Sequence, residues 1–394
     1  MWRLETRRLE EETPGWLLAA WDELGLGDRL HRVLRGEPRS RDVVELYRSP
    51  LWLLGAAASW LRSRLTGRRV GYVVNTVLNY TNVCVVACSF CSFYRPRGHP
   101  EAYTLSPREV AARARALWER YRIRQVLLQG GVNPDLGLDY YTEAIRGIKE
   151  ATRGKVAVHG LSVTEIAYLA RRERASVEEV VERLREAGLD SVPGALETLS
   201  PRTARILAPA KPGPREWLDT MSRVMGLGVP VSATMVYGHV ESLWERAEHL
   251  LRLLDLQRRH GRIMAFIAWN YEPGGNSLSR LVPYRAWGGE LLRSVAVARL
   301  VFRGEILWIQ AGWLTAGPRL GAAAVEYGAN DWGGTLYGES VLPAAGVPLP
   351  RLVRETVERL IRDAGFEPFE RDNWYRPVRG EEDAAGKGVA AAVA

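Results

Sequence analysis

The feature of this sequence that most constrains its fold is an alternation, from Gly71 onward, of short apolar runs with longer amphipathic segments. This pattern is typical of a parallel sheet with crossover helices. Eight such units over about 270 residues match the size of a (β/α)8 barrel, so we expect an α/β chain with a TIM-type barrel. The expected strands are the run into Asn79-Tyr80, Gln125 to Gln129, Val156 to His159, Ser191-Val192, Val231 to Tyr237, Ile263 to Trp269, Leu307 to Ala311 and Ala329 to Trp332.

Helix-capping signals occur between these runs. Ser106 is followed by Pro107 and Glu109, which predicts a helix that begins with a capping box and a proline in its first turn. Ser176 and Glu179 predict a second helix of the same kind. In a barrel, the reactive groups lie on loops at the C-terminal ends of the strands, which is where polar and glycine-rich segments occur here.

The sequence predicts three regions. Residues 1 to 70 are expected to form an N-terminal helical extension, because apolar residues such as Leu17 and Trp21 recur at helical spacing. Residues 71 to 345 are expected to form the barrel. Residues 346 to 394 are expected to form a C-terminal helical extension and a disordered tail, because the last residues, RGEEDAAGKGVAAAVA, are low in complexity.

Composition narrows the class of protein. The 394 residues are 46% hydrophobic and 25% charged, as in an ordinary globular protein. The net charge of +8 is spread among acidic residues rather than gathered in one run, so we expect no nucleic-acid partner. The first residues lack the apolar run of a secretory signal, which predicts a cytoplasmic protein. Residues 51–61 are far shorter than the roughly 20 residues of a membrane span, so none is expected.

The three cysteines of the chain, Cys84, Cys88 and Cys91, lie in one loop after the first expected strand. Their C-x3-C-x2-C spacing suits metal ligation better than disulfide bonds. Three thiolates on a 4Fe-4S cluster leave one iron without a protein ligand, and an open coordination position can bind a cofactor. We interpret the motif as a cluster that binds and cleaves S-adenosylmethionine to start radical chemistry.

The alternative for the same cysteines is a structural zinc site in a zinc-stabilised binding protein. Such a site normally has four Cys or His ligands, and His99 is the nearby candidate for the fourth. Arg95 and Arg97 could neutralise an anionic cluster or bind a substrate carboxylate, and solvated surface arginines are the other interpretation.

Candidate cofactor-binding residues follow three other strands. Gln129, Gly130 and Gly131 form a turn whose glycines allow close backbone approach, and we expect it to bind the amino group of S-adenosylmethionine. Glu197 is expected to bind the ribose hydroxyls or the amine of the same cofactor, and Ser162 adds a polar group at the barrel mouth. A plain strand-to-helix turn and a helix-capping carboxylate are the alternative interpretations.

Candidate catalytic residues also lie at strand ends. His239, His159 and Glu241 are our candidates for a general base, because histidine titrates near neutral pH. Trp269 and Trp313 offer flat apolar walls for an aromatic substrate. Histidines that only donate structural hydrogen bonds and tryptophans that only pack in the core are the alternatives.

These motifs together resemble a known family, cyclic dehypoxanthinyl-futalosine synthase, a radical S-adenosylmethionine enzyme of the futalosine route to menaquinone. The resemblance covers residues from about 60 to 375. It is carried by NYTNVC with the following cysteines, the QGG turn, the histidine in the third strand, YGHVE, AFIAW and GANDWGGT. Two related families share these motifs: aminofutalosine synthase and the radical subunit that builds the deazaflavin chromophore.

Smaller details bear on the choice among the three families. Tyr94, the Gly98-His99 pair, Trp269 and residues 309–321 look like the cyclising enzyme. The HVE of residues 239–241 looks at least as much like the related families, which carry it where the cyclising enzyme usually has HGE. The loop PGALET, Ala316 and Ala268 also depart from the pattern of the cyclising enzyme.

The resemblance implies a reaction and its partners. The radical would remove a ribose C4' hydrogen from dehypoxanthine futalosine, and the carbon radical would add to the benzoate ring. Loss of an electron and a proton would then restore aromaticity. The expected partners are a small aromatic nucleoside-like substrate and an external low-potential electron donor.

Overall fold

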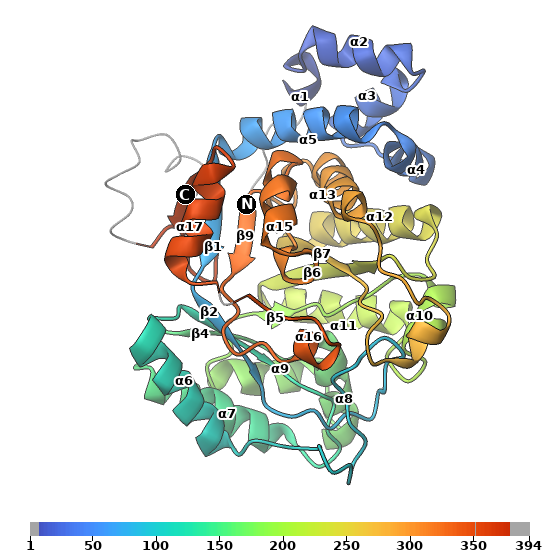
Figure 1. Ribbon diagram of the computed structural model, residues 1–394. Helices are drawn as coiled ribbons and strands as arrows, with labels where there is room; N and C mark the ends of the chain where they lie inside the picture. The colour runs from blue at the N-terminus through green and yellow to red at the C-terminus, as the bar shows by residue number, and fades with distance from the viewer. Residues whose placement is uncertain (1–7, 351, 379–394) are drawn as a thin grey trace.

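The computed structural model describes residues 8–350 and 352–378, so the tail predicted to be disordered, residues 379–394, lies outside the described residues. Figure 1 shows α1, α2 and α3 at one end of the molecule, next to the long helix α5. Helix α5 packs against α13, and this accounts for its many apolar residues. The bounds of the N-terminal helices are α1 (Arg8–Glu11), α2 (Gly15–Glu23), α3 (Gly27–Arg35), α4 (Ser40–Arg48) and α5 (Leu51–Thr66).

The described strands fall into three parallel sheets, which confirms the α/β class. The first sheet has the order β10 (Glu367–Glu370), β1 (Arg69–Val73), β9 (Asp331–Gly334). The second has the order β2 (Asn75–Asn79), β3 (Gln125–Gln129), β4 (Ala157–Gly160). The third has the order β5 (Val192–Pro193), β6 (Val231–Tyr237), β7 (Ile263–Asn270), β8 (Trp308–Ile309).

Isolated parallel bridges connect neighbouring sheets. They join His159 to Ser191, Gln310 to Asp331 and Thr76 to Tyr337. The order from β2 to β9 therefore follows the chain, as in a TIM-type barrel, but the arrangement is a partial barrel of three sheets rather than one continuous sheet. One physical reason is that β5 ends at Pro193, which has no N–H to extend the pairing.

Helices follow the strands and cover the outside of the sheets (Figure 1). The capping boxes predicted at Ser106 with Glu109 and at Ser176 with Glu179 are confirmed. None of the helices in the described residues combines the length and apolarity needed to span a membrane. Their bounds are α6 (Pro107–Tyr121), α7 (Leu138–Ala151), α8 (Val163–Glu173), α9 (Val177–Glu186), α10 (Pro201–Leu207), α11 (Pro214–Gly226), α12 (Leu243–His260), η1 (Ser277–Arg280), α13 (Gly288–Phe302), α14 (Trp313–Ala316), α15 (Pro318–Glu326), α16 (Val341–Ala344) and α17 (Arg354–Asp363).

The C-terminal region contributes a strand as well as a helix. After α17, β10 pairs with β1, and the chain then returns to the inside of the sheets. Arg371 forms a buried ion pair with Asp331, with Nε and Nη2 lying 2.5 and 2.9 Å from its carboxylate oxygens. Asn373 accepts a hydrogen bond from Gln125 Nε2 at 2.7 Å. The C-terminal residues therefore close one end of the space that the sheets surround.

Candidate active site

The cysteine loop begins directly after β2. The structure places Cys84, Cys88 and Cys91 there as free, partly buried thiols. Cys84 and Cys88 contact a small apolar cluster that is separate from the main core. The buried members of this cluster are Val86, Val132, Leu207, Ala208, Tyr271, Leu278 and Val282.

The glycines of the QGG turn allow the cysteine loop to pack against the end of β3. A Cβ atom at Gly131 would lie 2.2 Å from the carbonyl oxygen of Val83 and 2.8 Å from Cys84 Cβ. A Cβ atom at Gly130 would lie 2.7 Å from the ring of Tyr80. Only glycine fits such close approaches without a shift of the neighbouring chain. The turn thus sets the position of the cysteine loop.

Burial raises the pKa of the Cys88 and Cys91 thiols. The charge of Lys211 opposes this effect at Cys88, and the backbone N–H groups of Tyr94 and Phe93 oppose it at Cys91. Buried thiols of this kind ionise when a bound metal compensates the thiolate charge. The donor set therefore fits a metal cluster held through sulfur.

The zinc alternative depends on His99 as the candidate fourth ligand. His99 is exposed, and its Nδ1 accepts a hydrogen bond from Glu101 N at 3.1 Å. Within residues 8–350 and 352–378, no group of three or more His, Cys, Asp or Glu side chains is placed to hold a metal ion, and this includes the three cysteines with or without His99. The case for a metal cluster rests on three sulfur donors in one loop.

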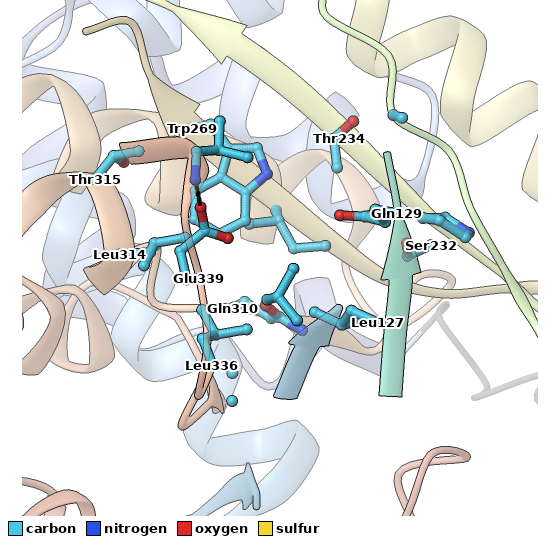
Figure 2. Close-up of a pocket in the computed structure, with 18 of the residues that line it drawn as sticks. Leu127, Gln129, Ser232, Thr234, Trp269, Gln310, Leu314, Thr315, Leu336 and Glu339 are labelled. Carbon is cyan, nitrogen blue, oxygen red and sulfur yellow. Dashed lines mark hydrogen bonds between the residues drawn. The ribbon is translucent and has the colours of Figure 1, made fainter. Parts of the chain in front are cut away.

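A cavity of about 370 Å³ extends from the cysteine loop into the space between the sheets. Figure 2 shows Gln129, Trp269 and Glu339 reaching this cavity from different elements. Because Cys91 and Trp269 line the same cavity, a group bound at the cysteines would lie beside the substrate space. Other lining residues include Asn75, Gln125, His159, Ala195, Glu197, Asn270, Glu272, Gln310, Trp313, Leu314, Thr315, Trp332, Arg371, Asn373 and Tyr375.

Glu197 lines the cavity and is neutralised by a buried lysine. Lys211 Nζ donates to the two carboxylate oxygens of Glu197 at 2.7 and 2.9 Å and to Ala195 O at 2.8 Å. Both side chains are nearly buried, with 12% and 13% of their surface exposed. The pair sits beside the cysteine loop, since the Lys211 charge also acts on Cys88.

His159 lines the cavity and is bonded at both ring nitrogens. Nδ1 lies 2.7 Å from Ser191 Oγ, and Nε2 lies 3.2 Å from Ser232 Oγ. Burial, assisted by the charge of Arg371, lowers the pKa of His159 to about 3. The ring is therefore neutral near pH 7, and its surroundings favour a structural role.

His239 and Glu241 are not among the residues that line the cavity. His239 Nε2 bonds the carbonyl of Val236 at 2.9 Å, within its own turn. Glu241 accepts hydrogen bonds from Gly238 N at 2.7 Å and from Arg246 Nε at 2.8 Å. Burial raises the pKa of Glu241, but the bond with His239 and the Arg246 charge prevail and lower it to about 2. The structure therefore does not bring these two candidate bases to the substrate space.

Ser162 also has a local role. Its hydroxyl caps helix α8 by accepting from Glu165 N at 3.2 Å, and its own N–H donates to Glu165 Oε2 at 2.6 Å. Glu165 in turn bonds the hydroxyl of Tyr80, the residue that precedes the cysteine loop. Ser162 is absent from the cavity lining, so the structure shows it as a helix cap rather than a cofactor contact.

Glu339 is a lining residue that sequence reasoning missed. Among the charged side chains lining the cavity, Glu197, Glu272 and Arg371 each have a partner of opposite charge. No described cation pairs with Glu339; its carboxylate accepts from the backbone N–H groups of Val341 and Leu342 at the start of α16. Burial raises its pKa. The available signal was its position just beyond the GANDWGGT motif.

Comparison with known proteins agrees with this geometry. Residues 78–253 match the radical SAM superfamily, and residues 260–383 match the CofH/MqnC C-terminal region. The structure is similar to the hydrogenase maturase HydG of Carboxydothermus hydrogenoformans, with a TM-score of 0.70, 18% identity and coverage of 96% of this chain and 87% of the other. It is also similar to methylornithine synthase, with a TM-score of 0.68, 18% identity and coverage of 86% and 97%. These similarities concern the fold.

Two curated relatives carry different names. Cyclic dehypoxanthine futalosine synthase of Streptomyces coelicolor is 36% identical over 90% of this chain and 89% of its own length. A 5-amino-6-(D-ribitylamino)uracil–L-tyrosine 4-hydroxyphenyl transferase of Methanosarcina barkeri is 35% identical over 89% of this chain and 94% of its own length.

The parallel partial barrel and the three-cysteine loop at a strand end define a radical S-adenosylmethionine enzyme. Such enzymes work with a 4Fe-4S cluster and S-adenosylmethionine. The chain belongs to the radical SAM family that carries the CofH/MqnC C-terminal region.

Proposed function

We propose that this enzyme cyclises dehypoxanthine futalosine in menaquinone biosynthesis. The observation that carries the proposal is the single cavity lined by both Cys91 and Trp269, which lets radical chemistry at the cysteines meet an aromatic substrate. Two curated relatives at 36% identity are named cyclic dehypoxanthine futalosine synthase, one from Streptomyces coelicolor and one from Halalkalibacterium halodurans. Three unpaired cysteines suit a reducing compartment, so a cytoplasmic location is part of the proposal.

In this proposal Cys84, Cys88 and Cys91 hold a 4Fe-4S cluster. The cluster and S-adenosylmethionine, when bound, supply the 5'-deoxyadenosyl radical that removes hydrogen from the substrate. Gln129 and Glu197 line the cavity beside the cysteines and are placed to bind the cofactor, with Gly130 and Gly131 setting the backbone there. We further propose that β2 to β9 act as one closed barrel that excludes water from this space, supported by the bridges between the sheets.

The substrate ring is proposed to lie against Trp269, where flat contact holds it in one orientation. Restoring the aromatic ring after cyclisation releases one proton and one electron. We assign the proton to Glu339, which lines the cavity and has no cationic partner among the described residues, rather than to His239, His159 or Glu241. The electron would return to the 4Fe-4S cluster that Cys84, Cys88 and Cys91 would hold, which balances the one electron that cleavage of S-adenosylmethionine requires.

A second candidate is the transfer reaction of the deazaflavin pathway. It is favoured by the 35% identity to the Methanosarcina barkeri transferase and by the HVE at residues 239–241. Aminofutalosine synthase activity is the third candidate function.

The test is anaerobic reconstitution followed by assay of each substrate by mass. We expect 5'-deoxyadenosine and a cyclic product from dehypoxanthine futalosine. Formation of 5'-deoxyadenosine together with a new product only from tyrosine and 5-amino-6-(D-ribitylamino)uracil, or only from an enolpyruvyl benzoate, would contradict the proposal. A colourless protein that leaves S-adenosylmethionine intact would support the alternative of a zinc-stabilised binding protein.

A further inference from the structure

Gln310 and Tyr375 form a hydrogen-bonded pair in the wall of the cavity. Gln310 directly follows β8, and Tyr375 belongs to the C-terminal segment after β10. Gln310 Nε2 donates to the Tyr375 hydroxyl at 2.9 Å, and both residues line the cavity. Figure 2 shows the Gln310 side chain between Leu336 and Leu127, which also line the cavity. The pair therefore belongs to the substrate space.

Each member of this pair keeps one hydrogen-bonding position open. No described residue donates to Gln310 Oε1. The Tyr375 hydroxyl accepts from Gln310, but its own proton has no acceptor among the described residues. Burial raises the pKa of Tyr375 to about 12 against the opposing charge of Arg371, so the hydroxyl keeps this proton near pH 7. The pair therefore offers one acceptor and one donor side by side.

Polar side chains around the C-terminal segment instead satisfy one another. Asn75 Nδ2 donates to Gln125 Oε1 at 2.9 Å, and Gln125 Nε2 donates to Asn373 Oδ1 at 2.7 Å. Ser191 Oγ lies 3.2 Å from Asn373 Oδ1 and 2.7 Å from His159 Nδ1. This network holds the C-terminal segment in place, so the pair does not need its open positions for that purpose.

Strand register places Gln310 deeper in the cavity than Trp269. Phe266 pairs with Ile309, so Gln310 lies beside Ile267, which lines the cavity as Trp269 does. Two residues of β7 separate Ile267 from Trp269, and this is a distance of about 7 Å along the strand. A substrate whose aromatic ring lies against Trp269 therefore places its adjoining group within reach of the pair.

Gly333 keeps the acceptor of the pair uncovered. Its φ of +94° is a conformation that favours glycine, and a Cβ atom there would lie 3.1 Å from Gln310 Oε1. Gly333 also lines the cavity. A side chain at this position would crowd the acceptor, so the glycine preserves access to it from the substrate space.

We propose that Gln310 and Tyr375 bind the 2' and 3' hydroxyl groups of the substrate ribose. The inference rests on the proposed function, whose substrate carries a ribose and a benzoate ring. A pair of neighbouring hydroxyls matches the site because one donates to Gln310 Oε1 while the other accepts from the Tyr375 hydroxyl. With the ring against Trp269, these bonds hold the sugar in one orientation, which removal of one particular hydrogen requires.

Substrate analogues test the pair without any change to the protein. The probes are dehypoxanthine futalosine and its 2'-deoxy and 3'-deoxy forms, assayed with the reconstituted enzyme. We expect kcat/KM for the full substrate to be about tenfold above that for each analogue, because each analogue leaves one polar group of the pair unbonded.

Variants separate recognition of the sugar from a structural role. Tyr375→Phe removes the donor and Gln310→Met removes the acceptor, so each should lower kcat/KM for the full substrate about tenfold and reduce its discrimination against one analogue to less than about twofold. Tyr140→Phe is the control, since its hydroxyl donates to Leu105 O at 2.7 Å and Tyr140 does not line the cavity. An equal fall on all three compounds in Tyr375→Phe and in Gln310→Met, or lost discrimination in the control, would overturn the diol site.

Failure of the proposed function has a different signature. Cyclic product formed by the wild type with equal kcat/KM from the full substrate and both deoxy forms would overturn the diol site alone. A wild-type enzyme that makes 5'-deoxyadenosine but no cyclic product from dehypoxanthine futalosine would overturn the proposed function, and the diol site with it.

Discussion

Lys211 Nζ lies 2.7 and 2.9 Å from the two carboxylate oxygens of Glu197, beside the cysteine loop and at the edge of the cavity. The ion pair gives a nearly buried carboxylate a partner of opposite charge. It also places a cation near Cys88.

Removal of Lys211 alone should lower the free energy of unfolding more than removal of both charges of the pair. Lys211→Met leaves a buried, uncompensated carboxylate at Glu197, for which we expect a loss of about 3 kcal/mol in the free energy of unfolding. Glu197→Gln combined with Lys211→Met should recover more than half of this loss, as measured by urea unfolding. Equal losses in the single and double variants would show that the charge of Glu197 does not depend on Lys211.

Gly131→Ala should displace the cysteine loop, because its Cβ would lie 2.2 Å from Val83 O. We expect the reconstituted variant to hold less than about half of the wild-type iron and to lose about 1–3 kcal/mol of stability by overpacking. Gly213→Ala is the matched control, since a Cβ there meets nothing within 4 Å. Iron content and visible absorbance measure the effect, and full iron loading of Gly131→Ala would contradict it.

His159 should make the protein sensitive to acid. Burial lowers its folded-state pKa from 6.5 to about 3, so the unfolded chain binds a proton that the folded chain does not. Stability is therefore complete above about pH 6.5 and falls by about 1.4 kcal/mol per unit as the pH decreases toward 3. His159→Gln removes this titration and should reduce the slope of urea-unfolding stability against pH between about 6.5 and 4.5 by about 1.4 kcal/mol per unit, while the buried His249, whose pKa is lowered to about 4, keeps its own contribution. An unchanged slope in the variant would show that other groups cause the acid sensitivity.

Glu339→Gln should uncouple radical formation from product. The amide keeps an oxygen for the N–H groups of Val341 and Leu342 but cannot take a proton. We expect product formation to fall about 10²-fold while 5'-deoxyadenosine is still formed. Glu339→Asp should restore part of the activity, which a purely structural role would not predict. Wild-type product formation by Glu339→Gln would remove Glu339 from the mechanism.

Strand and helix positions were largely predictable because their signals are local. The run Val231–Tyr237 is a strand with the expected bounds, and Ser106 with Glu109 forms the expected capping box. The expected strand at Leu307 to Ala311 is reduced to Trp308–Ile309, since strand length depends on what the neighbouring strand offers for pairing. The β10 strand was missed because its partner β1 lies almost 300 residues earlier in the chain.

The sequence alone determined the chemistry of this protein: three cysteines in eight residues after a strand require no tertiary information to indicate a metal-cluster loop. Only the tertiary structure decided which polar residues reach the cavity. His239 and Glu241 satisfy each other and Arg246 within one turn, whereas Asn373 reaches Gln125 across 248 residues. The reason is physical, because a cavity is lined by side chains that long-range strand pairing turns inward, and neither composition nor local spacing reports that direction.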